Sequence, residues 1–279
     1  MIGRLKRKWI VHIAELNKAS FMQWQQFNLP SATTHSEYTV ISFSGSKWFA
    51  DQLFSLYSFY RNVGKPKQWL IYNDGTYCEL QLQALRKIDR VTVCNLDLST
   101  AILPQAALQK FPTLKKVEIV SKHISDGDII ITDSDILFYK HFNEYVKRES
   151  KINYYLVDES NSYFDKDFLL QHPFIEYPFN FGLLLLQSTF NLGSIFNYIN
   201  ERFNSEVLDY WSDQTAFQKL VMKDKTFQPL DKNLFKVGGN DSFHISQCVD
   251  YNKIALRHFV GPVRHKMWQY SWKKVLGIK

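Results

Sequence analysis

Three Asp-x-Asp triplets occur in the chain, and their surroundings differ. Residues 126–128 are typical of a turn, and residues 165–167 of a solvated loop or the start of a helix. Residues 133–135, with the sequence Asp-Ser-Asp, come directly after the apolar run 129–131, which is typical of a buried strand. This second triplet is the best candidate for chemistry, with a helix cap or a pair of solvated loop acids as the alternative interpretation.

Asp133 and Asp135 are spaced so that both carboxylates can reach one point. In an extended backbone, residues i and i+2 point to the same side. Two such carboxylates repel each other unless a positive charge lies between them. A hard divalent cation such as Mn²⁺ or Mg²⁺, with its shell completed by phosphate oxygens, supplies that charge. The spacing therefore predicts a metal site that holds a nucleoside diphosphate.

The elements that position this triplet alternate between strands and helices. Strands are predicted at residues 38–43, 68–72, 91–94 and 128–132. Helices are predicted between them, at residues 46–64, at 76–88 with a capping box from Thr76 and Glu79, and at 112–124. The alternation indicates βαβ crossovers and an α/β fold, with a mainly parallel central sheet flanked by helices. The triplet then lies at the carboxyl edge of the sheet, where open α/β sheets bind ligands.

The second half of the chain has a less regular pattern. Further strands are predicted at residues 154–157, 181–186 and 255–259, and further helices at 193–203 and 213–223. An aromatic-rich loop is predicted between residues 161 and 178. We see no internal repeat and no long linker, so one large domain with a less regular tail is expected.

Four segments of the chain resemble motifs of GT-A glycosyltransferases, in the same order. They are residues 127–138, similar to the family's strand and D-x-D motif; 180–186, similar to its N-x-G strand; 211–217, similar to its D-Q segment; and 258–268, similar to its closing H-x-x-G motif. The pattern is most similar to the retaining branch that includes glycogenin and bacterial lipooligosaccharide galactosyltransferases. Arg264 stands at that branch's Lys position, and Lys266 and Trp268 come two residues late, without its Pro.

The resemblance implies a GT-A fold with a Rossmann-like nucleotide-binding half and an acceptor-side half. It spans residues 38–268, between a basic N-terminal extension of residues 1–37 and a basic aromatic tail of residues 269–279. It also implies transfer of a sugar, with retention, from a nucleotide-diphosphate donor such as a UDP-sugar. The acceptor would be a hydroxyl of a glycan or of a lipid-linked saccharide.

The resemblance further implies roles for individual residues. Asp133, Asp135 and His258 would bind Mn²⁺ or Mg²⁺, and Asp213 and Gln214 would lie near the reacting carbon. The residues expected to contact the donor nucleotide or its sugar are Phe43, Ser44, Lys116, Asp133, Ser134, Asp135, Asn180, Gly182, Gly261, Arg264 and Lys266.

Ordinary structural roles remain open for several of these residues. Core packing is the alternative for Phe43, and a solvated helix face for Lys116 and its neighbour Lys115. Helix or strand caps are the alternatives for Asn180 and Asp213, with Gln214 exposed. The basic segment 264–266 would otherwise be an ordinary surface turn.

Composition limits the partners and the compartment. The chain carries 34 Lys and Arg against 27 Asp and Glu, a net charge of +7 that favours anionic partners. Cys78, Cys94 and Cys248 lie far apart, which argues against a disulfide framework and a zinc site. No apolar window is long enough to span a membrane.

These features predict a cytoplasmic protein. The basic termini, residues 1–16 and 264–279, could contact the inner face of a membrane, and a solvated, frayed N-terminus is the alternative. The oligomeric state stays open.

Two other functions compete with glycosyl transfer. A haloacid-dehalogenase-type phosphatase would use Asp133 as nucleophile and Asp135 as acid/base, but its motif usually lies near the start of the domain. A basic membrane- or nucleic-acid-binding module would explain the net charge and the aromatic tail with Trp268, Tyr270 and Trp272. No recognised nucleic-acid motif occurs in the chain, so a nucleic-acid partner is not expected.

Overall fold

The computed structural model describes residues 2–146, 151–161, 163–238, 250–269 and 272–278. Cys248 and Tyr270 lie outside the described residues. The chain forms two compact units, each built from separate segments. Unit 1 contains Met1–Cys94, Asp133–Lys147 and Asn233–Lys279, and unit 2 contains Asn95–Thr132 and Arg148–Lys232.

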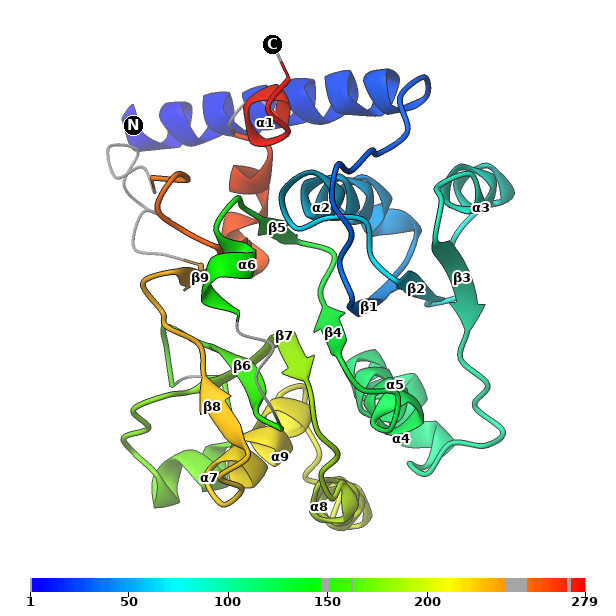
Figure 1. Cartoon of the computed structure of the whole chain (residues 1–279). Coiled ribbons are helices and arrows are strands. Elements are labelled where there is room, and N and C mark those ends of the chain that lie inside the picture. Colours follow the sequence, from blue (N-terminus) through cyan, green and yellow to red (C-terminus); the bar gives the residue numbers. More distant parts are fainter. Residues whose placement is uncertain (1, 147–150, 162, 239–249, 270–271, 279) are drawn as a thin grey trace. The chain divides into compact units, whose positions relative to one another are not determined.

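Unit 1 contains the βαβ crossovers expected from the sequence (Figure 1). Its larger group of strands has the order β3-β2-β1, from Val91–Asn95, Gln68–Asn73 and Thr39–Ser44. Strands β1 and β2 are parallel, with Val40 opposite Trp69 and Ser44 opposite Asn73. They are joined through the short 3-10 helix η1 (Ser46–Trp48) and helix α2 (Phe49–Asn62). Helix α3 (Glu79–Arg86) connects β2 to β3.

The N-terminal segment is a long helix of unit 1, α1 (Ile2–Gln25), and not the frayed terminus considered from the sequence. Phe21 of α1 is fully buried. Its ring lies 5.4 Å from those of Phe54 and Trp268 and 5.6 Å from that of Trp272 on helix α10 (Trp272–Val275). The two ends of the chain, blue and red in Figure 1, therefore pack together on α2. Apolar packing, more than the basic residues, explains why this terminus is ordered.

A second, three-stranded sheet of unit 1 has the order β5-β10-β9. Strand β5 (Ile136–Phe138) pairs antiparallel with β10 (Leu256–His258), and β10 pairs parallel with β9 (Phe235–Val237). Two short helical segments complete the described part of unit 1: α6 (Phe142–Tyr145) and the 3-10 helix η4 (Gly261–Met267). Only β10 of this sheet matches a strand predicted from the sequence.

Unit 2 has four strands in the order β4-β7-β6-β8. Their bounds are Ile129–Thr132, Phe179–Leu186, Asn153–Val157 and Phe227–Pro229. Strand β7 is antiparallel to β4 and β6, whereas β6 and β8 are parallel, so β7 alone runs against the other three. All residues of β4 and β7 are buried, as their continuous apolar sequences predict.

The described helices of unit 2 surround these strands. They are α4 (Gln105–Lys110), the 3-10 helix η2 (Pro112–Leu114), α5 (Lys115–His123), α7 (Lys166–Gln171), α8 (Gly193–Asn204) and α9 (Ser212–Val221). The predicted turn before β4 is confirmed, since Gly127 and Asp128 have φ values of 63° and 44°. The predicted α/β class, mainly parallel strands flanked by helices, is confirmed.

One local prediction was wrong, and another was confirmed only in part. The capping box of α3 is formed by Cys78 and Gln81, whereas Thr76 and its neighbour Asp74 form a turn before the helix. Residues 165–167 do start a helix, α7, but Asp165 is fully buried and only Asp167 is solvated. The spacing of residues predicted where these helices start. It did not predict which polar side chains cap them, because tertiary contacts compete for polar side chains.

Candidate metal centre and active site

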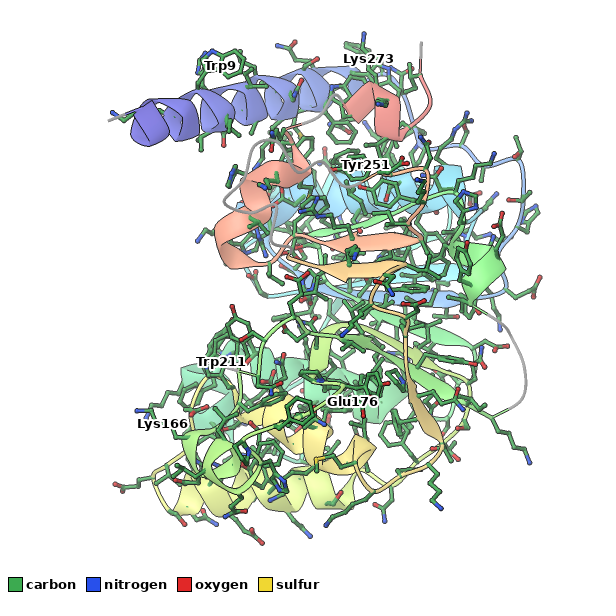
Figure 2. All side chains as sticks on the ribbon, turned by 90° about the vertical axis from the view of Figure 1, so that its left-hand side faces the viewer. Trp9, Lys166, Glu176, Trp211, Tyr251 and Lys273 are labelled. Carbon is green, nitrogen blue, oxygen red and sulfur yellow. The ribbon has the colours of Figure 1, made fainter. Side chains whose placement is uncertain are left out.

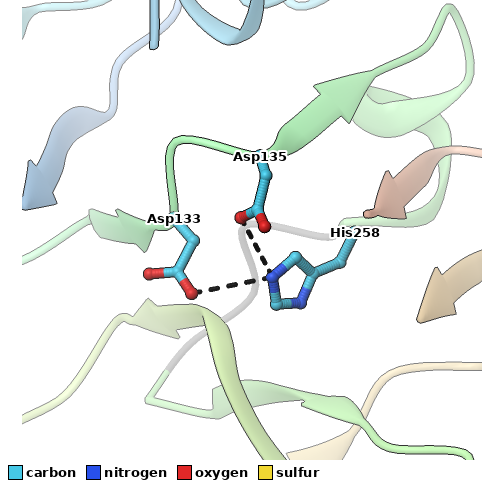
Figure 3. Close-up of side chains that lie close together, drawn as sticks. All are labelled: Asp133, Asp135 and His258. Carbon is cyan, nitrogen blue, oxygen red and sulfur yellow. Dashed lines mark ion pairs between the residues drawn. The ribbon is translucent and has the colours of Figure 1, made fainter. Parts of the chain in front are cut away.

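Asp133, Asp135 and His258 come together in unit 1, as the sequence predicted (Figure 3). One ligand atom from each lies within 4.8 Å of the others. The imidazole Nε2 of His258 is 3.2 Å from Oδ1 of Asp135 and 3.6 Å from Oδ2 of Asp133. The three side chains therefore converge on one point.

The pairing of β5 with β10 explains this convergence. Ile136, the residue after the triplet, is the register partner of His258. The backbone N–H of Phe259 then donates a 2.9 Å hydrogen bond to the carbonyl of Asp135. Two short strands thus hold His258 beside a triplet from a distant part of the sequence.

The three ligand candidates differ in their access to solvent. Asp135 and His258 are buried, whereas the Asp133 side chain is 23% exposed. Burial by itself raises the pKa of Asp135, but the charge and proximity of His258, and then Arg264, hold that pKa below its ordinary value. Asp135 is therefore ionised at neutral pH, as a metal ligand must be.

This donor set fits a hard divalent cation. Two carboxylates and one imidazole suit Mn²⁺ or Mg²⁺ when phosphate or water oxygens complete the shell. Oδ1 of Asp135 is buried and accepts no aligned hydrogen bond from the described residues. A cation at the point of convergence would satisfy this atom and relieve the repulsion between the carboxylates.

Arg264 lies against the same carboxylate. Its guanidinium donates a hydrogen bond to Oδ2 of Asp135 and stacks on the indole of Trp48, 3.6 Å from the ring centroid. The sequence suggested Arg264 as a diphosphate contact but gave no sign of Trp48, which lies just after β1 in η1. A planar stack restricts the guanidinium to a few orientations, which suits recognition of phosphate oxygens.

Asp51 of α2 was missed by the sequence analysis. It is 1% exposed and accepts a 2.7 Å hydrogen bond from Nε1 of Trp268. NH1 of Arg264 lies 3.8 Å from its Oδ2, and Nζ of Lys18 lies 3.6 Å from its Oδ1. Burial raises the pKa of Asp51, and these partners oppose the shift. An acid among the apolar residues Phe49, Leu53 and Phe54 of this helix was the available signal.

The other unit 1 candidates lie on the segments that flank these residues. Ser44 is buried at the end of β1, and Phe43 is half-buried beside it. Ser134 is buried between the two acids. Gly261 begins η4 with a φ of 33°, in the region that favours glycine. Lys266 is 7% exposed, so it is not part of a solvated surface turn.

The remaining candidates lie in unit 2. The amide of Asn180 donates a 2.6 Å hydrogen bond to Asp158, and its oxygen accepts one of 2.8 Å from the backbone of Gly182. Asn180 is the second residue of β7, so it lies at the start of the strand with both ends of its amide hydrogen-bonded. Asp158 is another residue that sequence reasoning missed, because nothing in its local pattern sets it apart. The Nζ of Lys116 lies 5.2 Å from the Phe181 ring centroid.

Asp213 and Gln214 lie in the first turn of α9 and are both buried. The N-cap position belongs to Trp211, so Asp213 is not the cap. Its carboxylate accepts a 2.7 Å hydrogen bond from the backbone of Gln214. The side-chain amide of Gln214 donates a 3.2 Å hydrogen bond to the carbonyl of Tyr163, so it is not the exposed residue considered from the sequence.

No protein-family model and no curated protein matches this sequence, but solved structures match its fold. The galactosyltransferase LgtC, in complex with donor and acceptor sugar analogs, has a TM-score of 0.60 at 14% identity, over 86% of this chain and 95% of LgtC. The apo form of the glycosyltransferase GlyE of Streptococcus pneumoniae TIGR4 has a TM-score of 0.54 at 13% identity, over 87% of this chain and 62% of GlyE.

The bifunctional glycosyltransferase WbbM has a TM-score of 0.53 at 14% identity, over 84% of this chain and 47% of WbbM. At these identities the likeness concerns the fold. The predicted GT-A fold is thereby confirmed, and what the site does has to be argued from its own residues.

Proposed function

We propose that this protein is a metal-dependent glycosyltransferase that moves a sugar from a nucleotide-diphosphate donor, a UDP-sugar, to a hydroxyl group. The observation that supports this most is the convergence of Asp133, Asp135 and His258 on one point, next to the guanidinium of Arg264. A GT-A fold and the donor and acceptor sugar analogs bound by LgtC agree with this proposal. The acceptor is a glycan or a lipid-linked saccharide.

Asp133, Asp135 and His258 would hold Mn²⁺ or Mg²⁺. The bound ion would neutralise negative charge on the departing diphosphate. Arg264 follows β10 and is oriented by Trp48 and Asp51. It would therefore place a second positive charge near the diphosphate with little loss of side-chain entropy. Lys266 lies two residues further along η4 and is the next candidate for the diphosphate.

Asp213, Gln214 and Asn180 would position the donor sugar. During transfer the bond from the anomeric carbon to the diphosphate oxygen breaks. The acceptor oxygen then bonds to that carbon, and its proton passes to the departing diphosphate. We infer that the configuration of the sugar is retained. An inverting enzyme needs a carboxylate that acts as general base on the acceptor hydroxyl. The Asp213 carboxylate accepts a hydrogen bond from the backbone of Gln214, and both side chains are buried, so this pair suits the orientation of a sugar better than that role. Positioning of this kind supplies a large share of a transfer reaction's acceleration.

The decisive experiment is a screen of nucleotide sugars for binding and hydrolysis, with and without Mn²⁺. Wild-type protein should be stabilised by UDP only when Mn²⁺ is present, and it should turn over at least one UDP-sugar. Asp135→Asn should lose both effects, whereas the matched control Asp250→Asn, a surface acid of the same unit, should keep them. Absence of turnover for every nucleotide sugar would overturn the proposal, and hydrolysis of a phosphomonoester without any nucleotide would favour a phosphatase.

We also propose that unit 1 contacts the inner face of an anionic membrane, where a lipid-linked acceptor would lie. None of the described helices is long and apolar enough to cross a membrane. Trp9 and Leu16, seven residues apart on α1, are 66% and 57% exposed. Lys273 and Lys274 on α10 are exposed as well, and Figure 2 shows Trp9 and Lys273 at the same end of this unit.

Exposed apolar side chains on a helix, together with exposed basic residues, are typical of interfacial binding. Wild-type protein should sediment with phosphatidylglycerol vesicles and not with phosphatidylcholine vesicles. Trp9→Ala should reduce the bound fraction, whereas Trp48→Ala, which changes an indole stacked under Arg264, should leave vesicle binding unchanged. Equal sedimentation of wild type with both kinds of vesicle, or with neither, would contradict the membrane contact.

A further inference from the structure

Asp165 of unit 2 is fully buried and surrounded by polar partners, although the sequence offers it only as the start of a chance triplet. Its carboxyl group lies 2.9 Å from Nε of Arg202. Ser212 donates a 3.0 Å hydrogen bond to Oδ1, and the hydroxyl of Tyr198 donates one to Oδ2. Burying a carboxyl group costs free energy unless such partners surround it, so a specific role is expected for it.

Asp165 contacts helix α8 through Tyr198 and Arg202, and it also contacts the first turn of α9. Its backbone N–H donates a 2.8 Å hydrogen bond to Oγ1 of Thr215, while its side chain holds Ser212. Ser212 and Thr215 directly flank Asp213 and Gln214. Asp165 thus holds the helix turn on both sides of these two residues.

A second set of contacts joins the same two segments. The carbonyl of Tyr163, two residues before Asp165, accepts the hydrogen bond from the side chain of Gln214. The rings of Tyr163 and Trp211 lie 4.9 Å apart. The segment 163–165 and the start of α9 therefore form one cross-linked structure.

Helix α9 lacks a side-chain cap at its N-cap residue. Trp211 occupies the N-cap position, and it makes no side-chain capping bond among the described residues. Asp165 instead holds this turn from outside the helix, through the hydroxyl groups of Ser212 and Thr215.

We propose that Asp165 is a positioning residue that fixes the first turn of α9, and with it the orientation of Asp213 and Gln214 toward the donor sugar. This inference rests on the proposed glycosyltransferase function. It requires no contact between Asp165 and any substrate, because its effect passes through Ser212, Thr215 and the backbone between them.

The test compares Asp165→Asn with Asp167→Asn. Both acids lie within 4 Å of Arg202 in the same short segment, but the Asp167 side chain is 67% exposed, and its ion pair among the described residues is with Arg202 of α8, not with α9. Asp165→Asn should lower kcat for transfer by about 10- to 100-fold, the loss expected from a small misplacement of reacting groups. Its Kd for UDP with Mn²⁺ should stay within about twofold, because UDP lacks the sugar on which Asp213 and Gln214 would act. Asp167→Asn should match wild type in both measurements.

Hydrogen exchange of the amides of residues 212–216 gives a readout that does not need activity. Exchange there should become faster in Asp165→Asn and stay unchanged in Asp167→Asn. If wild type turns over no nucleotide sugar, the proposed function fails, while faster exchange in Asp165→Asn alone would still support the positioning role.

The inference is overturned if a folded Asp165→Asn protein shows wild-type exchange and kcat. It is also overturned if UDP affinity falls as steeply as kcat, since that would indicate general damage. If circular dichroism shows Asp165→Asn to be unfolded, Tyr198→Phe replaces it, because this change removes one donor to Asp165 and leaves the ring in place. Smaller changes in the same direction are then expected, and no change in exchange or kcat would overturn the inference.

Discussion

The indole N–H of Trp268 donates a 2.7 Å hydrogen bond to Asp51, although 217 residues separate the two in the chain. This hydrogen bond holds the end of η4 against helix α2. Because Arg264 lies between Asp51 and Asp135, the same contact helps to set the guanidinium beside the candidate metal ligands. The buried carboxyl group of Asp51 therefore contacts both a residue that holds the C-terminal segment on α2 and a residue of the candidate metal centre.

The contact between Asp51 and Trp268 leads to a stability prediction. Asp51→Ala should lower the free energy of unfolding by about 1–3 kcal/mol, because the indole N–H loses its acceptor in a buried environment. Urea denaturation followed by circular dichroism measures this change. Asp250→Ala, at an exposed acid of the same unit, should change the midpoint little, and an equal effect in both variants would contradict the role given to Asp51.

Removal of a ligand candidate should weaken metal binding. His258→Ala should lower the affinity for Mn²⁺ by at least about tenfold, a loss found even for residues that only support metal ligands. Titration calorimetry, or the free Mn²⁺ signal in electron paramagnetic resonance, measures this affinity. His141→Ala changes a histidine that pairs with Glu144 and should bind Mn²⁺ like wild type. Unchanged affinity in His258→Ala would remove His258 from the site.

Replacement of Arg264 by lysine should be costly even though the charge is kept. Lysine lacks the planar group that stacks on Trp48 and reaches both Asp51 and Asp135. We expect Arg264→Lys to raise the Kd for UDP with Mn²⁺ by about fivefold to tenfold, equivalent to roughly 1 kcal/mol for a lost cation–π contact. Arg86→Lys, at an exposed arginine of α3, is the control. Equal affinity of Arg264→Lys and wild type would mean that charge alone matters at this position.

The buried carboxyl group of Asp165 should make stability depend on pH. Burial, and then the nearby Asp209, raise the pKa of Asp165 from 3.8 to about 7, and Tyr198 and Arg202 oppose the shift. Between these values the folded state binds more protons than the unfolded state. The stabilisation from this group is therefore fully present below about pH 4 and is lost as the pH rises to about 7.

Asp165→Asn cannot titrate, which isolates this contribution. The difference in free energy of unfolding, wild type minus Asp165→Asn, should fall between pH 4 and pH 7 and level off above it. Chemical denaturation at a series of pH values measures the difference. A difference that grows with pH would show that the ion pair with Arg202 dominates and that the pKa of Asp165 is lowered.

The sequence alone was enough to predict the fold class and the order of most long elements. Strand β4 and the turn before it were predicted from a continuous apolar run and an Asp-Gly pair, which are local signals. The predicted group of Asp133, Asp135 and His258 came from the order of the motifs. Strands β5 and β9 have only three residues each, too few for a periodic pattern, and they were not predicted.

What the sequence determined by itself is the chemistry available: two acids two residues apart, a histidine and an arginine after a distant strand, and an Asp-Gln pair at a helix start. Tertiary structure decided which other residues hold these groups. Trp48 stacks on Arg264, Asp51 joins Arg264 to Trp268, and Asp165 lies buried against α9, because their partners come from segments far along the chain. Periodicity and propensity describe neighbours in sequence, whereas burial and pairing of a polar side chain depend on which surfaces meet when the chain folds.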